Sequence, residues 1–467
     1  MMPGGTDWRD NVRLAGEARE ALRGHCRDWL HGHDETQLDF ILCVAVTAGS
    51  AAESEKLWGI VVGVSSSGKS EDIKMIFGVA DARVSDLTAA GLLSWIGADK
   101  KNAKKTGLLT RVASPAFIVI EDLAPMLSDT ADKRNRSKLV AMLRKVYDGE
   151  VQRDLGGTPG QAEWSGHVTM LAASTKVIDQ QSAMLDEAGP RWLIYRSREA
   201  DSAVRVHGAR GTLSATEKAA KRERAARLAA DAVRNGRIAF GQTELSEHAT
   251  GVLGDVAVAV GTMRGNVPRD GYRRDIIGLP STEEPYRLAA QLQLLARAAM
   301  AYGYSEGRAV ELARTVALGT VQPDRMKVLE VLCDGEAHSA SEIGRRKKMH
   351  RHVATRALED LAQLRITVCT NEDVVLPGEA KFWKLTRTNE GRISAHVIMG
   401  KGGGMKSENH PPIPPDREDL GLDPGSADPT VSTLFVPGLD GYEHPDGTID
   451  WDAIWSMADH TARVTDE

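Results

Sequence analysis

The order of apolar and polar segments predicts an α/β core in the first half of the chain. Short apolar runs alternate with longer stretches whose apolar residues recur at helical spacing, the pattern of buried strands connected by helices. The predicted strands are 57–62, 79–84, 116–122, 168–172 and 189–196. The predicted helices of this half are 8–35, as one helix or two, 37–47, 70–77 and 136–147. We therefore expect a three-layer α/β core that follows a helical lead-in.

The segment Asp148–Gly166 interrupts this alternation and predicts a β-hairpin. It contains glycines, a proline and Trp164, a composition that suits two short strands joined by a turn. Further along, Thr216–Arg237 is a charged helical stretch, and Pro285–Met300 carries apolar residues in helical register. The middle of the chain is therefore predicted to be helical.

The C-terminal part contains three short helical patterns, at 324–332, 339–349 and 350–364. Ser339 and Glu342 have the spacing of a capping box at the start of the second helix. Two alternating segments, 366–369 and 381–386, then predict a two-stranded wing, so this part resembles a winged helix-turn-helix. Its basic side chains form a stripe suited to DNA phosphates: Arg345, Arg346, Lys347, Lys348, Arg351 and Arg356. Winged helices also serve as protein–protein modules, and that alternative stays open.

From about residue 399 the chain becomes rich in glycine, proline and acids, which predicts a disordered tail. Residues 450–458 include two tryptophans and predict a short helix that docks onto a protein partner.

Composition adds little to this picture but excludes some classes. Charged residues make up 27% and the net charge is −6, so nucleic acid would have to bind at local basic patches. The four cysteines lie far apart and indicate neither a zinc site nor a disulfide framework. No segment has the length of a membrane span or the pattern of a signal peptide, and we expect a cytoplasmic protein without membrane contact.

The candidate chemistry begins with a phosphate-binding loop between the first strand and its helix. Its sequence matches the pattern G-x-x-x-x-G-K-[ST] and comprises Gly63, Val64, Ser65, Ser66, Ser67, Gly68, Lys69 and Ser70. Glycines let the backbone N–H groups surround an anion, and the helix N-terminus adds partial positive charge. Lys69 is expected to contact the β- and γ-phosphates of ATP, and Ser70 to bind Mg²⁺.

Two acids, Glu121 and Asp122, end the strand 116–122 and are the candidates for the Mg²⁺-side acid and the water-polarising acid. Either Glu121 serves the metal and Asp122 polarises water, or Asp122 serves the metal and no separate base follows. We prefer Asp122 as the more important acid. A second basic cluster, at 100–105, is either a solvated loop or a surface facing nucleic acid.

This order of phosphate loop, acidic strand, helix, hairpin and strand resembles the AAA+ ATPases that carry a β-hairpin before the sensor-1 strand. It is similar to helicase-like ATPases of phage and mobile-element replication modules. The match is strong over 57–198 and looser over 270–372. The G-A-F-T-G-A loop of σ-contacting activators is missing between 70 and 115, which argues against that function.

The resemblance implies three further roles, those of sensor 1, sensor 2 and arginine finger. Ser174 or Thr175 stands at the sensor-1 position, and Arg287 stands at the sensor-2 position of the lid helix. Arg287 has the alternative of a surface pair with a neighbouring glutamate. Arg191 stands where the family supplies an arginine finger to the next subunit, with Arg196 as the second choice. The implied assembly is a homo-oligomeric ring, a hexamer in most such motors.

These patterns divide the chain into five segments. They are a helical lead-in (1–52), an AAA+ core (53–198), a helical insertion and lid (199–318), a winged helix (319–395) and an acidic tail (396–467). The function they favour is an ATP-hydrolysing motor that acts on DNA. The alternatives are a MoxR-like ATPase that remodels proteins, and an ATP-dependent DNA-binding switch with weak hydrolysis, which the unusual Glu-Asp order would suit.

Overall fold

A computed structural model of the chain describes residues 8–50, 55–64, 68–96, 104–127, 133–154, 161–181, 191–199, 201–204, 206, 213–371, 380–386, 394 and 397–399. Several predicted features lie outside these residues. They are Ser65–Ser67 of the phosphate loop, Lys100 and Lys101, the hairpin tip 155–160, and nearly all of the tail with its terminal helix.

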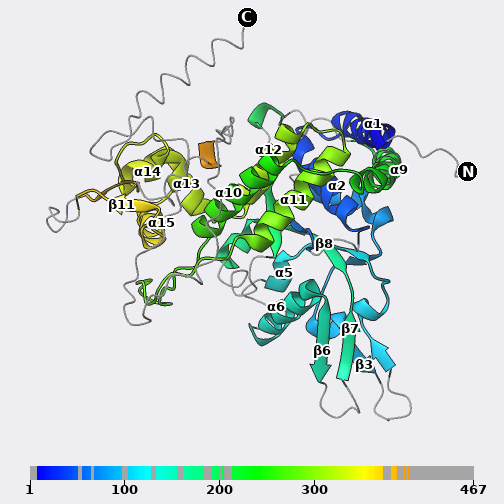
Figure 1. Ribbon diagram of the computed structural model, residues 1–467, viewed down its shortest axis with the longest axis horizontal. Coiled ribbons are helices and arrows are strands. Elements are labelled where there is room, and N and C mark those ends of the chain that lie inside the picture. Colours follow the sequence, from blue (N-terminus) through cyan, green and yellow to red (C-terminus); the bar gives the residue numbers. More distant parts are fainter. Residues whose placement is uncertain are drawn as a thin grey trace, which may run out of the picture.

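Five parallel strands form the central sheet, in the order β2-β5-β8-β1-β9. They are β1 (Trp58–Val62), β2 (Ala82–Val84), β5 (Ala116–Ile120), β8 (Val168–Ser174) and β9 (Trp192–Arg196). The middle strand, β8, is labelled in Figure 1. Because every pairing is parallel, the carboxyl ends of all strands share one edge, here called the carboxyl edge. At this edge Val62 of β1 lies between Ser174 of β8 and Arg196 of β9. Ligands of open parallel sheets bind at such an edge.

Helices cover both faces of the sheet. Successive side chains of each strand point to opposite faces, so a strand that is apolar throughout needs a covering layer on each side. Val61 of β1 and Leu57, the residue before β1, belong to one buried cluster, whereas Ile60 and Val62 belong to the other. The first cluster packs against α1 (Trp8–Arg27), α2 (Glu35–Thr47), α9 (Ala215–Phe240), α10 (Glu247–Met263), α11 (Tyr286–Ala301) and α12 (Glu306–Gly319). The second packs against α4 (Ala89–Leu92) and α6 (Lys133–Asp148).

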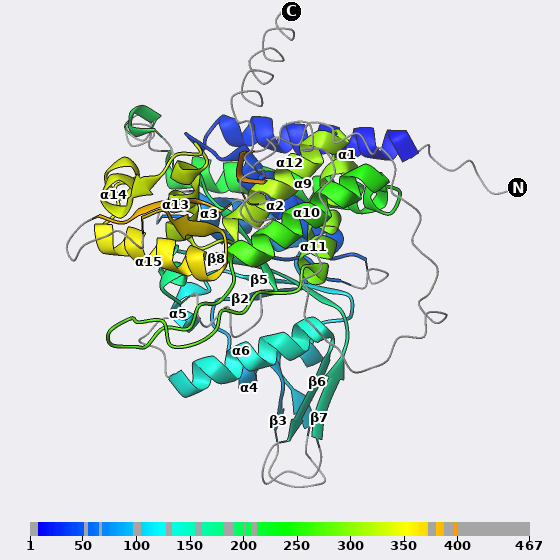
Figure 2. The same cartoon turned by 60° about the vertical axis from the view of Figure 1, so that its left-hand side comes forward.

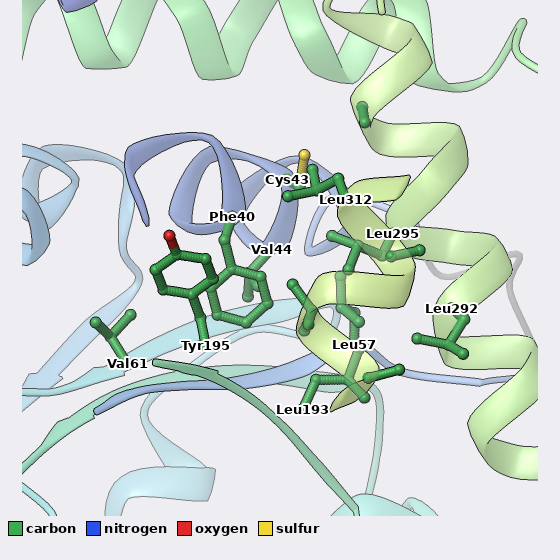
Figure 3. Close-up of a cluster of buried hydrophobic side chains, with 14 of the residues drawn as sticks. Phe40, Cys43, Val44, Leu57, Val61, Leu193, Tyr195, Leu292, Leu295 and Leu312 are labelled. Carbon is green, nitrogen blue, oxygen red and sulfur yellow. The ribbon is translucent and has the colours of Figure 1, made fainter. Parts of the chain in front are cut away.

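The helix α2 is buried from Gln37 to Thr47, between the sheet and the outer helices, and its residues 40–46 are accordingly apolar on every side of the helix rather than on one face. Its Phe40 ring stacks on Tyr195 of β9 with 5.7 Å between ring centroids (Figure 3). The approach requires a glycine in β1, since a Cβ at Gly59 would lie 2.8 Å from the Phe40 ring. Leu292 and Leu295 of α11 and Leu312 of α12 belong to the same cluster (Figure 3).

Two β-hairpins project from the core at the same end of the molecule (Figures 1 and 2). One consists of β3 (Ser94–Ile96) and β4 (Lys104–Thr106), the other of β6 (Glu150–Asp154) and β7 (Gln161–Ser165). Lys105 Nζ donates a hydrogen bond of 3.2 Å to the Glu163 carbonyl, which joins the hairpins side by side.

The C-terminal described part combines three helices with an antiparallel sheet in the order β10-β12-β11. Its elements are α13 (Pro323–Leu332), β10 (His338–Ser339), α14 (Ala340–Lys347), α15 (Arg351–Gln363), β11 (Thr367–Cys369) and β12 (Phe382–Leu385). Its buried residues continue the first cluster, and the buried Arg325 of α13 donates to the carbonyls of Met263 and Gly265 at the end of α10.

Shorter elements among the described residues are α3 (Lys69–Met75), α5 (Ala124–Leu127), and the 3₁₀ helices η1 (Phe77–Val79), η2 (Leu108–Thr110) and η3 (Lys176–Gln181).

The predicted parallel α/β core and the hairpin at 148–166 are confirmed, and all five predicted strands exist. The second strand is shorter than predicted, because η1 occupies its first residue and only Ala82–Val84 pairs with β5. Only one of the two hydrogen bonds of the predicted capping box at Ser339 forms. Ser339 Oγ accepts the Glu342 N–H, but the Glu342 carboxylate pairs with His338 and Arg346 instead of the cap backbone.

Candidate functional site

The phosphate loop leaves β1 at the carboxyl edge and leads directly into α3. Gly63 donates its N–H to the Ser174 carbonyl at 3.3 Å, which aligns the start of the loop with the end of β8. Gly68 has a left-handed conformation, with φ of +88°, and α3 begins at the next residue. Glycine accepts this conformation without strain, and it turns the chain into the helix at Lys69 and Ser70.

Lys69 is a buried cation at the centre of this edge. Its Nζ donates to the Val64 carbonyl at 3.2 Å, and no carboxylate lies within ion-pair distance among the described residues. Burial lowers the pKa of Lys69, while the negative charge of Asp122 opposes this shift. A buried ammonium group next to the phosphate-loop backbone suits an anionic ligand.

The two acids after β5 have different surroundings. Glu121 is exposed, and its N–H donates to the Val84 carbonyl at 2.9 Å. Asp122 is half-buried and accepts the Ala124 N–H at 3.0 Å, which caps α5. Of the two acids, Asp122 is the one whose charge acts on Lys69.

Ser174 and Thr175 lie between the phosphate loop and the acids, because β8 separates β1 from β5. Ser174 pairs with Val62, and its buried hydroxyl donates to the Thr175 carbonyl at 3.2 Å. On the other side of β8, the Leu123 N–H donates to the Ala173 carbonyl at 2.8 Å. The carboxyl edge therefore brings together Lys69, Asp122, Ser174 and the first residues of the loop.

These residues fit a magnesium-bound nucleotide. The Lys69 ammonium and the start of α3 supply positive charge for phosphates, and the Ser70 side chain is exposed beside them. Asp122 adds a carboxylate at the same edge, and oxygen atoms of this kind are the ligands that Mg²⁺ prefers.

Arg191 lies at the opposite edge of the sheet, one residue before β9 starts. Its side chain is buried and forms an ion pair with Asp148 at the end of α6, at 2.9 Å. It also lies over the Tyr147 ring, 5.5 Å from its centroid. The structure therefore does not bring Arg191 to the phosphate loop of its own chain. An action on a neighbouring subunit stays a prediction.

Arg287 lies at the same distant edge. Its guanidinium is 3.6 Å from Glu283 and 5.9 Å from the centroid of the Tyr147 ring. The Tyr147 hydroxyl bonds the Lys56 carbonyl, which precedes β1, so Arg287 and the phosphate loop are at opposite ends of that strand. The pair with Glu283, considered above as the alternative, is the contact that forms. Arg196, in contrast, ends at the carboxyl edge and pairs with Asp179 at 2.8 Å.

A polar network behind the phosphate loop could not be identified from the sequence. Asp72 of α3 is fully buried and accepts hydrogen bonds from His33 Nε2 at 2.9 Å and Gln37 Nε2 at 2.6 Å. Asp34, the N-cap of α2, accepts the Tyr195 hydroxyl at 2.8 Å. The network joins α3 to the α1–α2 connection and to β9. The cap preference of Asp34 was the only signal for it in the sequence.

The predicted basic stripe of the C-terminal part divides into paired and exposed residues. Arg346 pairs with Glu342 at 2.8 Å, and Lys347 pairs with Glu330 at 2.7 Å. The remaining members are exposed: Arg345, Lys348, Arg351 and Arg356.

Within the part of the chain that the structure describes, no helix is both long and apolar enough to cross a bilayer. No known family model matches the chain. A comparison with curated proteins found no significant match either.

Proposed function

We propose that the protein binds ATP with Mg²⁺ at the carboxyl edge and hydrolyses it, as an AAA+ type motor that acts on DNA. The observation that carries the ATP part is the buried Lys69, which follows the loop after β1 and lies at the same carboxyl edge as Asp122, which follows β5. A cation held there without a carboxylate partner among the described residues suits phosphate, and the loop around it has the sequence that phosphate binding requires.

In this proposal Lys69 binds the β- and γ-phosphates, and Ser70 and Asp122 hold the metal. The metal, when bound, neutralises the charge that develops on the transferring phosphoryl group. Ser174 or Thr175 hydrogen-bonds the γ-phosphate from the end of β8. Glu121, exposed beside Asp122, is the candidate to orient the attacking water if Asp122 serves the metal.

The route from this site to DNA runs through the β6–β7 hairpin. It connects α6 to β8, so it is directly followed by the strand that ends in Ser174. A shift of Ser174 between nucleotide states would be transmitted along β8 to the hairpin. The β3–β4 hairpin beside it carries Lys105, whose charge is suited to a phosphate backbone.

The proposal that the protein acts on DNA rests on exposed basic side chains in the C-terminal described part. The α13–α15 unit with its small sheet resembles a winged helix, and α15 exposes Arg351 and Arg356. A weakly hydrolysing DNA-binding switch is the second candidate, favoured by the different environments of the two acids. Asp122 caps α5, whereas Glu121 lies at the surface.

The test is ATP turnover with and without single-stranded DNA, measured for the parent and for Lys69→Ala. We expect Lys69→Ala to lose hydrolysis, because the phosphates lose their main cationic partner. Lys74→Ala removes an exposed lysine from the same helix and is the control, expected to retain turnover. Turnover of Lys69→Ala at the parent rate would refute the site. Turnover that DNA does not stimulate would favour the MoxR-like alternative, and no turnover in the parent would favour the switch.

A further inference from the structure

A cleft of about 420 Å³ lies between α15 and the turn that connects α10 to α11. This connection, residues 264–285, lies next to α15 in two views of the molecule (Figures 1 and 2). Its part that faces α15 is a turn of the sequence Arg269-Asp270-Gly271-Tyr272-Arg273-Arg274-Asp275. The cleft is lined by Arg269, Arg273, Arg274, Asp275, Ile276, His352, Thr355, Arg356 and Glu359.

The turn is held by hydrogen bonds between the Asp270 side chain and the backbone of the turn. The Asp270 carboxylate accepts the N–H groups of Tyr272 and Arg273, each at 2.6 Å, and that of Asp275 at 2.9 Å. Arg274 has a left-handed conformation, with φ of +65°, which closes the turn. An antiparallel bridge between Arg269 and Ile276 joins the two sides. The turn therefore presents its side chains from a defined scaffold.

Arg269 attaches this turn to α15. Its guanidinium donates to the Arg274 carbonyl at 2.6 Å and to the Arg356 carbonyl at 3.3 Å. It also forms ion pairs with Glu359 and Asp360 of α15, at 3.0 and 2.8 Å. One largely buried arginine thus brings the backbones of Arg274 and Arg356 next to each other, and their side chains line the same cleft.

The cleft has an excess of positive charge. Arg269 is neutralised by the acids of α15, and Glu359 is one of those acids. Among the described residues, no carboxylate lies within ion-pair distance of Arg273, Arg274 or Arg356, although Asp275 lines the rim. Three guanidinium groups that line one cleft without an acidic partner at ion-pair distance repel one another, and a bound polyanion relieves that repulsion.

An exposed aromatic side chain stands at the tip of the turn. Tyr272 is 93% exposed, the highest value among the large apolar side chains of the described residues. A tyrosine ring next to basic side chains is the combination with which proteins stack a base while they bind the backbone.

We propose that this cleft binds a nucleic acid backbone, with Arg273, Arg274 and Arg356 on successive phosphates and Tyr272 stacked on a base. The inference specifies the DNA-binding part of the proposed function and rests on it. The expected DNA contact is then centred on α15 and the 264–285 connection, and not on α14, where Arg346 and Lys347 are paired with glutamates. The shared ligand chemistry of single and double strands is the phosphodiester.

The test is the DNA affinity of the full chain without nucleotide, measured by fluorescence anisotropy over a range of salt concentrations. The probes are a labelled single strand and the duplex of the same sequence. The variant is Arg273→Gln with Arg274→Gln and Arg356→Gln. The control makes the same change of charge on α9, at Arg224, Arg227 and Arg234, far from the cleft (Figure 1). Thermal melting of both variants reports on the fold.

We expect the cleft variant to bind DNA on the order of 10²-fold more weakly than the parent. Its salt slope should fall by about 0.9 for each phosphate that the variant no longer neutralises. The control should bind as the parent does. Tyr272→Ala should weaken the single strand more than the duplex, whereas Tyr272→Phe should bind as the parent does, because the ring remains.

Parent-like affinity of a folded cleft variant would overturn the inference, and so would an equal loss of affinity in the control. A parent that binds neither probe would overturn both the inference and the DNA part of the proposed function. ATP hydrolysis that depends on Lys69 would still stand in that case, so the two failures are distinguishable.

Discussion

His33 is a titratable residue that contacts the phosphate-loop helix α3 through Asp72. Its ring is almost fully buried, and its Nε2 is 2.9 Å from the Asp72 carboxylate. Burial lowers the pKa of His33, but the hydrogen bond and charge of Asp72, together with the charges of Asp34 and Glu35, raise it, and the net shift is upward from 6.5. The folded protein therefore binds the proton of His33 more tightly than the unfolded chain does.

This linkage predicts a pH-dependent contribution of His33 to stability. The contribution is fully present below pH 6.5 and decreases as the pH rises through the higher pKa of the folded state. The free energy of unfolding of the parent minus that of His33→Asn should therefore be largest at acidic pH. Denaturant unfolding at a series of pH values measures it, with His248→Asn at an exposed position as the control. A difference that does not change with pH would mean that folding leaves the pKa of His33 unchanged, and a difference that is smallest at acidic pH would mean that the ring is neutral in the fold.

At this scale the sequence predicted local chemistry well and contacts between distant residues poorly. Lys69 and Ser70 follow from a continuous motif, since strand, glycine loop and helix are adjacent in the chain. Asp72 is only two residues beyond Ser70, yet its partners are distant in the chain, His33 in the α1–α2 connection and Gln37 in the first turn of α2. No spacing rule relates such residues, because the tertiary packing alone brings them together.

The end of helix α12 contacts strand β9 at the carboxyl edge of the sheet, the edge that carries the candidate site. α12 ends at Gly319, whose carbonyl accepts Arg196 Nε of β9 at 2.8 Å. A Cβ at Gly319 would lie 2.2 Å from the Ile194 carbonyl oxygen, so the two backbones touch there. This contact fixes the helical layer against the strand beside β1.

Gly319→Ala should therefore destabilise the protein by about 1–3 kcal/mol, the usual cost of forcing atoms into a packed contact. The direction of the change in stability is diagnostic, because replacing glycine by alanine within a helix normally raises the free energy of unfolding. Gly307→Ala near the start of the same helix meets no atom within 4 Å and should be neutral or stabilising. Thermal or denaturant melting compares the two, and equal effects would contradict the contact.

The type of an element was predictable wherever apolar residues repeated over many residues, as in α6, or where turn-forming residues separated two short strands, as in the β6–β7 hairpin. The β3–β4 hairpin and β10 were not predicted. Each has strands of two or three residues, which are too short to show a period. The connection 264–285 was also missed, because its order comes from Arg269 and α15 rather than from its own pattern.

For the whole molecule, the position of a residue on one or the other edge of the sheet decides its possible role. Arg191 and Arg287 were assigned to the nucleotide by their order in the chain, which the resemblance supplied. Both lie at the edge away from Lys69, around Tyr147. Only a neighbouring subunit could place Arg191 at a nucleotide, and a single chain contains no information on that neighbour.

Arg191→Ala should lower stability by about 1–3 kcal/mol, because it removes charged hydrogen bonds to Asp148 and the packing on Tyr147. Melting of the variant measures this effect. Lys176→Ala, which removes an exposed ion pair, is the control and should change little. A variant with parent-like melting that binds ATP, hydrolyses it slowly and regains turnover when mixed with Lys69→Ala would instead show an intersubunit finger.

The packing of α1 on α9 has a consequence for how the chain is made. His25 near the end of α1 contacts the Lys221 carbonyl of α9 at 2.9 Å, although the two helices start about 200 residues apart. A ribosome that adds roughly 5–20 residues per second needs about 10–40 s to supply the partner of α1. During that time the apolar side of α1 and all of α2 emerge without the surfaces that later cover them. We therefore expect α1 and α2 to depend on a chaperone that shields apolar surface at the ribosome until α9 and α11 have been translated.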